Sequence, residues 1–99
     1  MTLPVTFGRA AFAEFIEAVA WYEAQRPGLG GEFIAQIERC VLLAAAQPRR
    51  YAVVHNGIRR VVANRFPYSI YFRAQVKRIV VLAVFHSSRD PTIWQRREG

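Results

Sequence analysis

The spacing of hydrophobic residues changes at Pro48, and this change most constrains the fold. Before Pro48, apolar side chains recur every three to four residues across residues 10–25 and 31–46, which predicts two amphipathic helices. After it, residues 58–65, 68–73 and 78–85 form short runs rich in branched and aromatic residues, as strands do. Residues 3–7 are also compatible with a strand. The sequence therefore predicts an α+β fold in the order β-α-α-β-β-β.

The connection between the two predicted helices is short and contains strong helix breakers. Residues 26–31 hold one proline and three glycines, so the helices should form an antiparallel hairpin. The second helix should end before Pro48, because the residue preceding a proline disfavours the helical conformation. Near the end of the first helix, Trp21 and Tyr22 are expected to pack in the core.

The three later strands should form an antiparallel meander, because they follow one another closely. Residues 78–85 are apolar on both faces, which is typical of a central strand. Alternation in the preceding strand turns Tyr71 and Arg73 away from the face that the helical hairpin covers. We therefore expect a small, largely antiparallel sheet with one open, basic and aromatic face. Asp90 and Pro91 predict a short C-terminal helix that runs through Trp94.

Length and composition favour a single folded domain, residues 1–99. The hydrophobic content of 53% exceeds that of a disordered basic tail. Residues 1–7 lack the basic start and long apolar stretch of a signal peptide, and no apolar run approaches the ~20 residues of a membrane span, so we expect a cytoplasmic protein. Cys40 is the only cysteine and is expected in the core. His55 and His86 lack clustered carboxylates, so we expect no metal and no cofactor.

Positive charge is concentrated in the second half of the chain. Residues 1–48 hold three Arg against five Glu, a formal net charge of −2. Residues 49–99 hold ten Arg and Lys77 against Asp90 and Glu98, a formal net charge of +9. This asymmetry predicts attraction to nucleic acid or to an acidic protein.

One group of residues offers RNA-cleavage chemistry. The arginines Arg59, Arg60, Arg65 and Arg73 could stabilise a phosphorane, and Tyr71 or His86 could move a proton. A nuclease would use His86, Arg73 and Tyr71. A second acid or base is missing from this face, however, because every Glu except Glu98 belongs to the helical half. We therefore assign no catalytic residue, and we favour a structural role for His86, packed or hydrogen-bonded at the end of the last strand, over a catalytic one.

An ordered set of short motifs resembles toxins of the RelE/ParE superfamily, the toxic components of bacterial type II toxin–antitoxin systems. The resemblance covers almost the whole chain. Its motifs are AWYEAQRPGLG at residues 20–30, PRRY at 48–51, IRR at 58–60, RFPYSIYFR at 65–73, VLAVFH at 81–86 and RDP at 89–91, with Phe33 and Trp94. The resemblance implies a helical hairpin on a small antiparallel sheet.

The Trp-Tyr-Glu and Phe-Pro-Tyr segments place the chain nearer the ParE-like branch, whose members poison DNA gyrase without a catalytic set. The resemblance thus implies a binding toxin rather than an enzyme. His86 lies near a histidine that some RelE-like members use to cleave mRNA on the ribosome, so a ribosome-dependent endonuclease remains the alternative. A degenerate, non-toxic interaction module is a third possibility.

The resemblance also implies a partner. Antitoxins of this class carry an acidic or amphipathic C-terminal segment that folds on the toxin, which suits a basic face. We expect a hetero-oligomer of toxin and antitoxin. The residues expected to bind the antitoxin or the target are Arg59, Arg60, Arg65, Tyr71, Arg73, Arg89 and Trp94.

Overall fold

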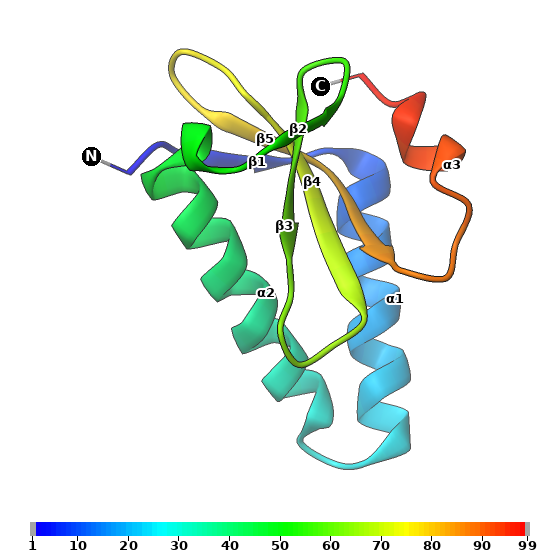
Figure 1. Cartoon of the computed structure of the whole chain (residues 1–99). Coiled ribbons are helices and arrows are strands. Elements are labelled where there is room, and N and C mark those ends of the chain that lie inside the picture. The colour runs from blue at the N-terminus through cyan, green and yellow to red at the C-terminus, as the bar shows by residue number, and fades with distance from the viewer. Residues whose placement is uncertain (1, 99) are drawn as a thin grey trace.

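The computed structural model describes residues 2–98; the two terminal residues of the predicted domain, 1 and 99, lie outside the described part. Two long helices lie behind a twisted sheet, and a short helix covers part of the other face (Figure 1). The elements, in chain order, are β1 (Val5–Phe7), α1 (Arg9–Gln25), α2 (Leu29–Ala46), the 3₁₀ turn η1 (Pro48–Arg50), β2 (Val53–His55), β3 (Ile58–Val62), β4 (Tyr68–Ala74), β5 (Ile79–His86) and α3 (Thr92–Gln95). The α+β fold is as predicted.

The sheet has five strands in the order β1-β5-β4-β3-β2. Strands β2 to β5 pair antiparallel with their neighbours, and β1 pairs parallel with β5. The predicted meander and the central place of the last strand are therefore confirmed. Strand β2 was not predicted. Its hairpin with β3 turns at Asn56 and Gly57, whose φ angles of 42° and 77° are those that an Asn-Gly hairpin turn requires.

The turn between α1 and α2 is held by a carboxylate from the end of α1. Glu23 accepts hydrogen bonds from the backbone N–H groups of Gly28 and Gly30, at 3.1 and 3.0 Å. These donors stand at the start of α2, where helical N–H groups have no partner within the helix. Gly28 adopts a left-handed φ of 91°, and a Cβ on Gly30 would lie 3.0 Å from the Val19 carbonyl oxygen. Both positions therefore favour glycine. Helix α2 begins at Leu29, two residues earlier than predicted.

The main core lies between the helical hairpin and the sheet. Its largest fully buried side chains include Phe33, Ile37, Ile70 and Phe72. Tyr22 packs against this core, with its ring centroid 5.1 Å from that of Phe33. The prediction for the two α1 aromatics is therefore half correct, since Trp21 is 59% exposed.

A bulge in β5 divides its side chains between two cores. The pairing with β4 shifts between Tyr71 and Phe72, opposite Ala83 and Val81. As a result Leu82 and Ala83, although adjacent, both belong to a second core on the sheet face away from the helical hairpin, here called the second face. Val84 returns to the main core, and Phe85 lies again in the second.

Helix α3 follows the predicted Asp-Pro start. The Asp90 carboxylate accepts the Thr92 N–H at 3.0 Å. This backbone hydrogen bond holds the pKa of Asp90 below its ordinary value. The following turn carries Trp94 back over the sheet.

Candidate functional site

The second face is not open where the sequence predicted it to be. Trp94 stacks on Tyr71 with ring centroids 3.9 Å apart and an interplanar angle of 17°. Both rings are buried in a cluster that also includes Phe85, Leu82 and Ile58. The expectation that Tyr71 is displayed to solvent is therefore wrong, because α3 closes over it. In this conformation Tyr71 and Trp94 contact each other rather than a partner.

The predicted arginines do not share one surface. Arg60 stands opposite Tyr71 in the β3–β4 ladder and is exposed on the second face. Arg59 stands opposite Phe72, which faces the helical hairpin, because successive residues of a strand point to opposite sides. Its guanidinium donates to the Tyr51 carbonyl oxygen at 2.6 Å. Of these two neighbours, only Arg60 projects from the second face.

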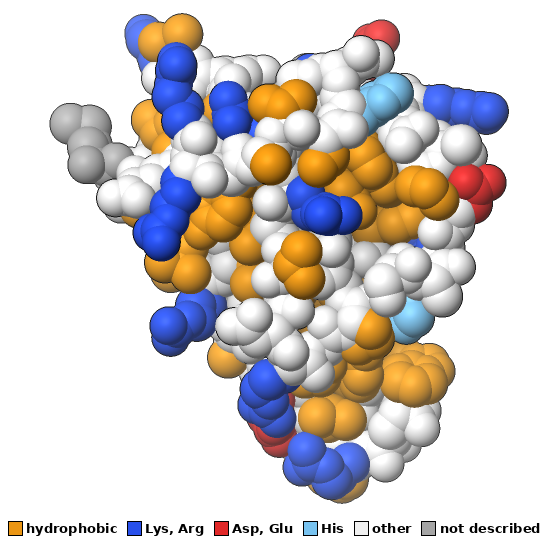
Figure 2. All heavy atoms as spheres, in the orientation of Figure 1, with side chains coloured by type: hydrophobic (Ala, Val, Ile, Leu, Met, Phe, Trp, Pro, Cys, Tyr) orange, Lys and Arg blue, Asp and Glu red, His pale blue; other side chains and the backbone are white. Residues whose placement is uncertain are grey.

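Arg73 also lies on the second face, opposite Ile58, and part of its hydrogen-bonding capacity is used within the protein. Its guanidinium donates to the carbonyl oxygen of Asn56 at 2.6 Å, which ties β4 to the β2–β3 turn. The exposed part of the second face therefore includes Arg60, the outer part of Arg73 and the exposed side chain of Val62. Near the centre of the view in Figure 2, one basic side chain is surrounded by apolar ones.

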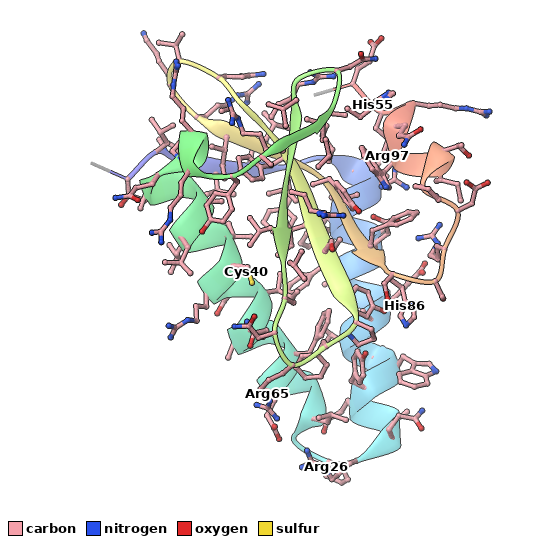
Figure 3. The ribbon with its side chains drawn as sticks, viewed as in Figure 1. Arg26, Cys40, His55, Arg65, His86 and Arg97 are labelled. Atoms are coloured by element: carbon pink, nitrogen blue, oxygen red, sulfur yellow. The ribbon has the colours of Figure 1, made fainter. Side chains whose placement is uncertain are left out.

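Arg65 lies outside this face, in the β3–β4 loop near the tip where the helical hairpin turns (Figure 3). It pairs with Glu32 at 2.6 Å, and Arg26 pairs with the other oxygen of that carboxylate at 3.0 Å. The hydrogen bonds from Arg65 and then from Arg26 lower the pKa of Glu32. Arg65 thus links the β3–β4 loop to α2, a structural role that its position in the sequence did not reveal.

Arg89 belongs to a charge network that sequence reasoning missed. Glu14 of α1 accepts from Arg89 at 2.8 Å and from both terminal nitrogens of Arg97 at 2.9 Å. It also accepts the Val84 N–H at 3.1 Å, while Arg97 donates to the Leu82 carbonyl oxygen at 3.0 Å. The two side chains thus satisfy backbone groups of β5 beyond the end of the short strand β1.

The three candidate nuclease residues are divided between the two faces of the sheet. Tyr71 and Arg73 lie on the second face. His86 follows Phe85 and therefore turns toward α1, where its ring packs edge-on against Tyr68 with centroids 5.2 Å apart. The Nδ1 atom of His86 lies 2.8 Å from the Ser88 hydroxyl and accepts the Ser88 N–H at 3.0 Å. These residues cannot act together on one phosphate in this structure.

His86 nevertheless borders a surface hollow of about 530 Å³ beside α1. Glu14, Glu17 and Arg89 also line it. The predicted grouping of His86 with the arginines of the basic face is wrong, because His86 faces α1. Glu14 and Glu17 of the helical half lie on that side of the sheet, beside His86. Glu14 is already bound by two arginines, which leaves Glu17 as the exposed carboxylate of the hollow.

A second hollow, of about 420 Å³, lies where β1 meets the helical hairpin and is almost wholly apolar. Its lining residues are Val5, Phe7, Phe15, Ile37, Glu38, Val41 and Leu42. Leu42 in this lining is 60% exposed, and Phe12 of α1, which is not part of the lining, is 54% exposed. Part of the predicted apolar stripe of α1 is therefore exposed to solvent, as expected of a protein-binding surface.

Two classes of site are not found within residues 2–98. No three His, Cys, Asp or Glu side chains gather as metal ligands would. No helix in the same range has the length and apolar character needed to cross a bilayer.

Comparison with known proteins adds a family and a fold. Residues 5–91 match the family model described as the ParE toxin of the type II toxin–antitoxin system parDE. A solved structure titled as a chromosomal ParDE TA system from P. aeruginosa superposes with a TM-score of 0.75. It is 20% identical in sequence, and the match covers 86% of this chain and 96% of that one, a likeness that concerns the fold. No curated protein sequence gives a significant match.

Proposed function

We propose that this chain, which belongs to the ParE toxin family of type II toxin–antitoxin systems, arrests bacterial growth by binding and poisoning DNA gyrase. The observation that carries the proposal is the family match over residues 5–91. The proposal is also supported by the placement of Tyr71 and Arg73 on one face of the sheet and of His86 on the other, because a nuclease would have to combine these groups.

The exposed part of the second face is the target-binding surface in this proposal. Arg60 projects there beside the exposed Val62, and Arg73 lies next to them. A guanidinium set among apolar side chains is the composition of a protein-docking surface, since Arg and apolar anchors supply most of the binding free energy at interfaces. Tyr71 and Trp94 then support this surface from below.

A cognate antitoxin neutralises the toxin in the cytoplasm, in a complex that contains both chains. The apolar hollow beside β1 and the exposed Phe12, Ile16 and Leu42 suit the apolar side of an amphipathic segment. Exposed Arg39 of α2 and Arg9 at the start of α1 suit its acidic side. The antitoxin site and the target site then lie on different sides of the sheet.

A gyrase assay with the purified chain tests the proposal. We expect supercoiling to be inhibited and cleaved plasmid to accumulate as the toxin is added, and Arg60→Glu to abolish both effects. The control, Arg39→Glu, reverses one exposed positive charge on the other side of the sheet. It should leave the inhibition of supercoiling and the accumulation of cleaved plasmid unchanged. Unchanged supercoiling and cleavage at a molar excess of toxin would refute gyrase as the target.

The hollow beside His86 supports a second candidate, an mRNA endonuclease, because it brings a histidine, a carboxylate and an arginine together. This candidate predicts cuts in translated mRNA that disappear in His86→Ala and in Glu17→Gln. Intact mRNA in a translating extract that contains the toxin would eliminate it. Absence of growth arrest on expression without antitoxin would instead identify a non-toxic module.

A further inference from the structure

Two segments that are distant in the sequence form one end of the molecule. The turn η1 follows α2, and the β4–β5 loop approaches it across a hollow of about 300 Å³. Leu3, Pro48, Arg49, Gln75 and Val76 are among the residues that line the hollow, so the two segments are neighbours. We call Arg49, Arg50, Val76, Lys77 and Arg78 the basic end; all five are exposed.

The charge of the basic end is not neutralised within the protein. The ion pairs among residues 2–98 belong to Arg26, Arg65, Arg89 and Arg97, and none involves the basic end. Figure 2 shows basic side chains gathered over η1 and the β4–β5 loop, at the upper left, whereas the acidic side chains visible in that view lie elsewhere. Four adjacent cations without a carboxylate repel one another, and an anionic partner would relieve this repulsion.

Neutral groups hold two of these cations in place. The Nε of Arg78 donates to the Gln75 side-chain oxygen at 2.9 Å, and one terminal nitrogen lies 3.4 Å from the Thr6 hydroxyl. Arg50 donates to the side-chain oxygen of Gln47 at 3.5 Å. Such contacts orient a guanidinium without cancelling its charge. They therefore lower the entropy lost when it binds an anion.

Helix electrostatics explains only half of the cluster. Arg49 and Arg50 follow the C-terminus of α2, where cations interact favourably with the negative end of the helix dipole. Lys77 and Arg78 lie in a β-hairpin, where no helix end requires them. Arg78 contacts only the neutral groups of Gln75 and Thr6, so no negative charge near the hairpin accounts for the charge of Lys77 and Arg78.

We infer that the basic end binds the phosphate backbone of duplex DNA without reading its base sequence. Its cations are suited to phosphate contacts, which provide affinity but no sequence information. None of the five residues is an aromatic on which single-stranded bases could stack, and the neighbouring Tyr51 packs against Phe72. Val76 is 92% exposed, and with the half-buried Leu3 and Pro48 it makes an apolar surface too small to anchor an acidic polypeptide. This inference deepens the proposed function and rests on it, because a gyrase poison acts where gyrase holds DNA.

Binding of a fluorescent duplex of about 20 base pairs by the full chain, followed by anisotropy at several salt concentrations, tests the inference. The test variant is R49Q/K77Q/R78Q. The matched control, R9Q/R39Q/R96Q, removes three exposed cations elsewhere and changes the net charge equally. We expect the test variant to lose at least about tenfold in affinity, with the salt slope smaller by roughly two to three. The control should lose less than about threefold, with its slope unchanged.

Equal losses in the two variants would overturn the inference, because net charge alone would then drive binding. Wild-type affinity in the test variant, or no duplex binding by the wild type, would also overturn it. Binding of a polyglutamate peptide, measured for the same variants, tests the alternative that the partner is an acidic protein. If the test variant loses peptide binding and keeps DNA binding, the partner is an acidic protein and the inference fails.

The gyrase assay separates this inference from the proposed function. DNA binding that behaves as expected, together with unaffected gyrase, refutes the proposed function and leaves the inference standing. Gyrase poisoned equally by the wild type and the test variant, with equal DNA binding, refutes the inference and leaves the proposed function standing. Thermal unfolding of each variant confirms that it is folded.

Discussion

The arginines beside α1 and those of the basic end carry the same charge in opposite surroundings. Arg89 and Arg97 are bound to Glu14, whose side chain is only 11% exposed, and Arg97 and Glu14 also bond to backbone groups of β5. The cations of the basic end face solvent and meet no carboxylate among residues 2–98. The first set is part of the fold, whereas the charges of the second contribute to it only through the favourable interaction of Arg49 and Arg50 with the C-terminal end of α2.

The same contrast explains why a count of arginines overestimates the binding surface. Of the five predicted site arginines, Arg65 and Arg89 pair with glutamates, and Arg59 and Arg73 donate to backbone carbonyls. Of these five, only the Arg60 guanidinium has no hydrogen bond or ion pair with another side chain or carbonyl among residues 2–98. Glutamates of the helices neutralise Arg65 and Arg89, and backbone carbonyls hold Arg59 and Arg73 in place. The number of arginines free to bind a partner therefore depends on the folded structure and not on the sequence count alone.

The largest effect should follow from breaking the Glu14 network. Glu14→Gln removes the charge that neutralises Arg97 and weakens the acceptor for the Val84 N–H, so we expect a loss of about 3 kcal/mol in the free energy of unfolding. Urea unfolding measures it. Glu17→Gln, one turn along α1 and exposed, is the control and should change stability by less than about 0.5 kcal/mol. Equal stability of Glu14→Gln and the wild type would show that the network is not structural.

A smaller effect should appear at the tip of the helical hairpin as a dependence on pH. The pKa of Glu32 is lowered from its ordinary value of 4.5 by Arg65 and Arg26. A carboxylate whose pKa is lower in the folded protein stabilises it above the unfolded value, and this stabilisation is lost as the pH falls through the folded pKa. It is therefore present above pH 4.5 and disappears in more acidic solution.

NMR titration of the Glu32 side chain in the wild type and in Arg65→Gln measures this directly. The pKa should rise toward 4.5 in the variant, and more than it does in Arg26→Gln, because the hydrogen bond from Arg65 is the larger cause. An unchanged Glu32 pKa in both variants would mean that the pairs do not persist in solution.

Much of the fold followed from local patterns, and the site did not. The helix period, Pro48 and the double-sided apolar run of β5 each depend on neighbouring residues, so they could be recognised in the sequence. Strand β2 was missed although the Asn56-Gly57 turn that creates it is a recognisable hairpin signal. The Glu14–Arg97 pair joins residues 83 positions apart, and the Tyr71–Trp94 stack depends on how α3 folds back. No periodicity could reveal either contact.

The smallest effect on stability should come from the basic end. R49Q/K77Q/R78Q breaks no ion pair and frees only the Gln75 and Thr6 contacts of Arg78, while it reduces repulsion among like charges. Its free energy of unfolding should therefore lie within about 0.5 kcal/mol of the wild type per substitution, and increase slightly at low salt. Urea unfolding at low and high ionic strength measures both. A large loss of stability would contradict the comparison with Glu14, because it would mean that these cations, too, hold the fold together.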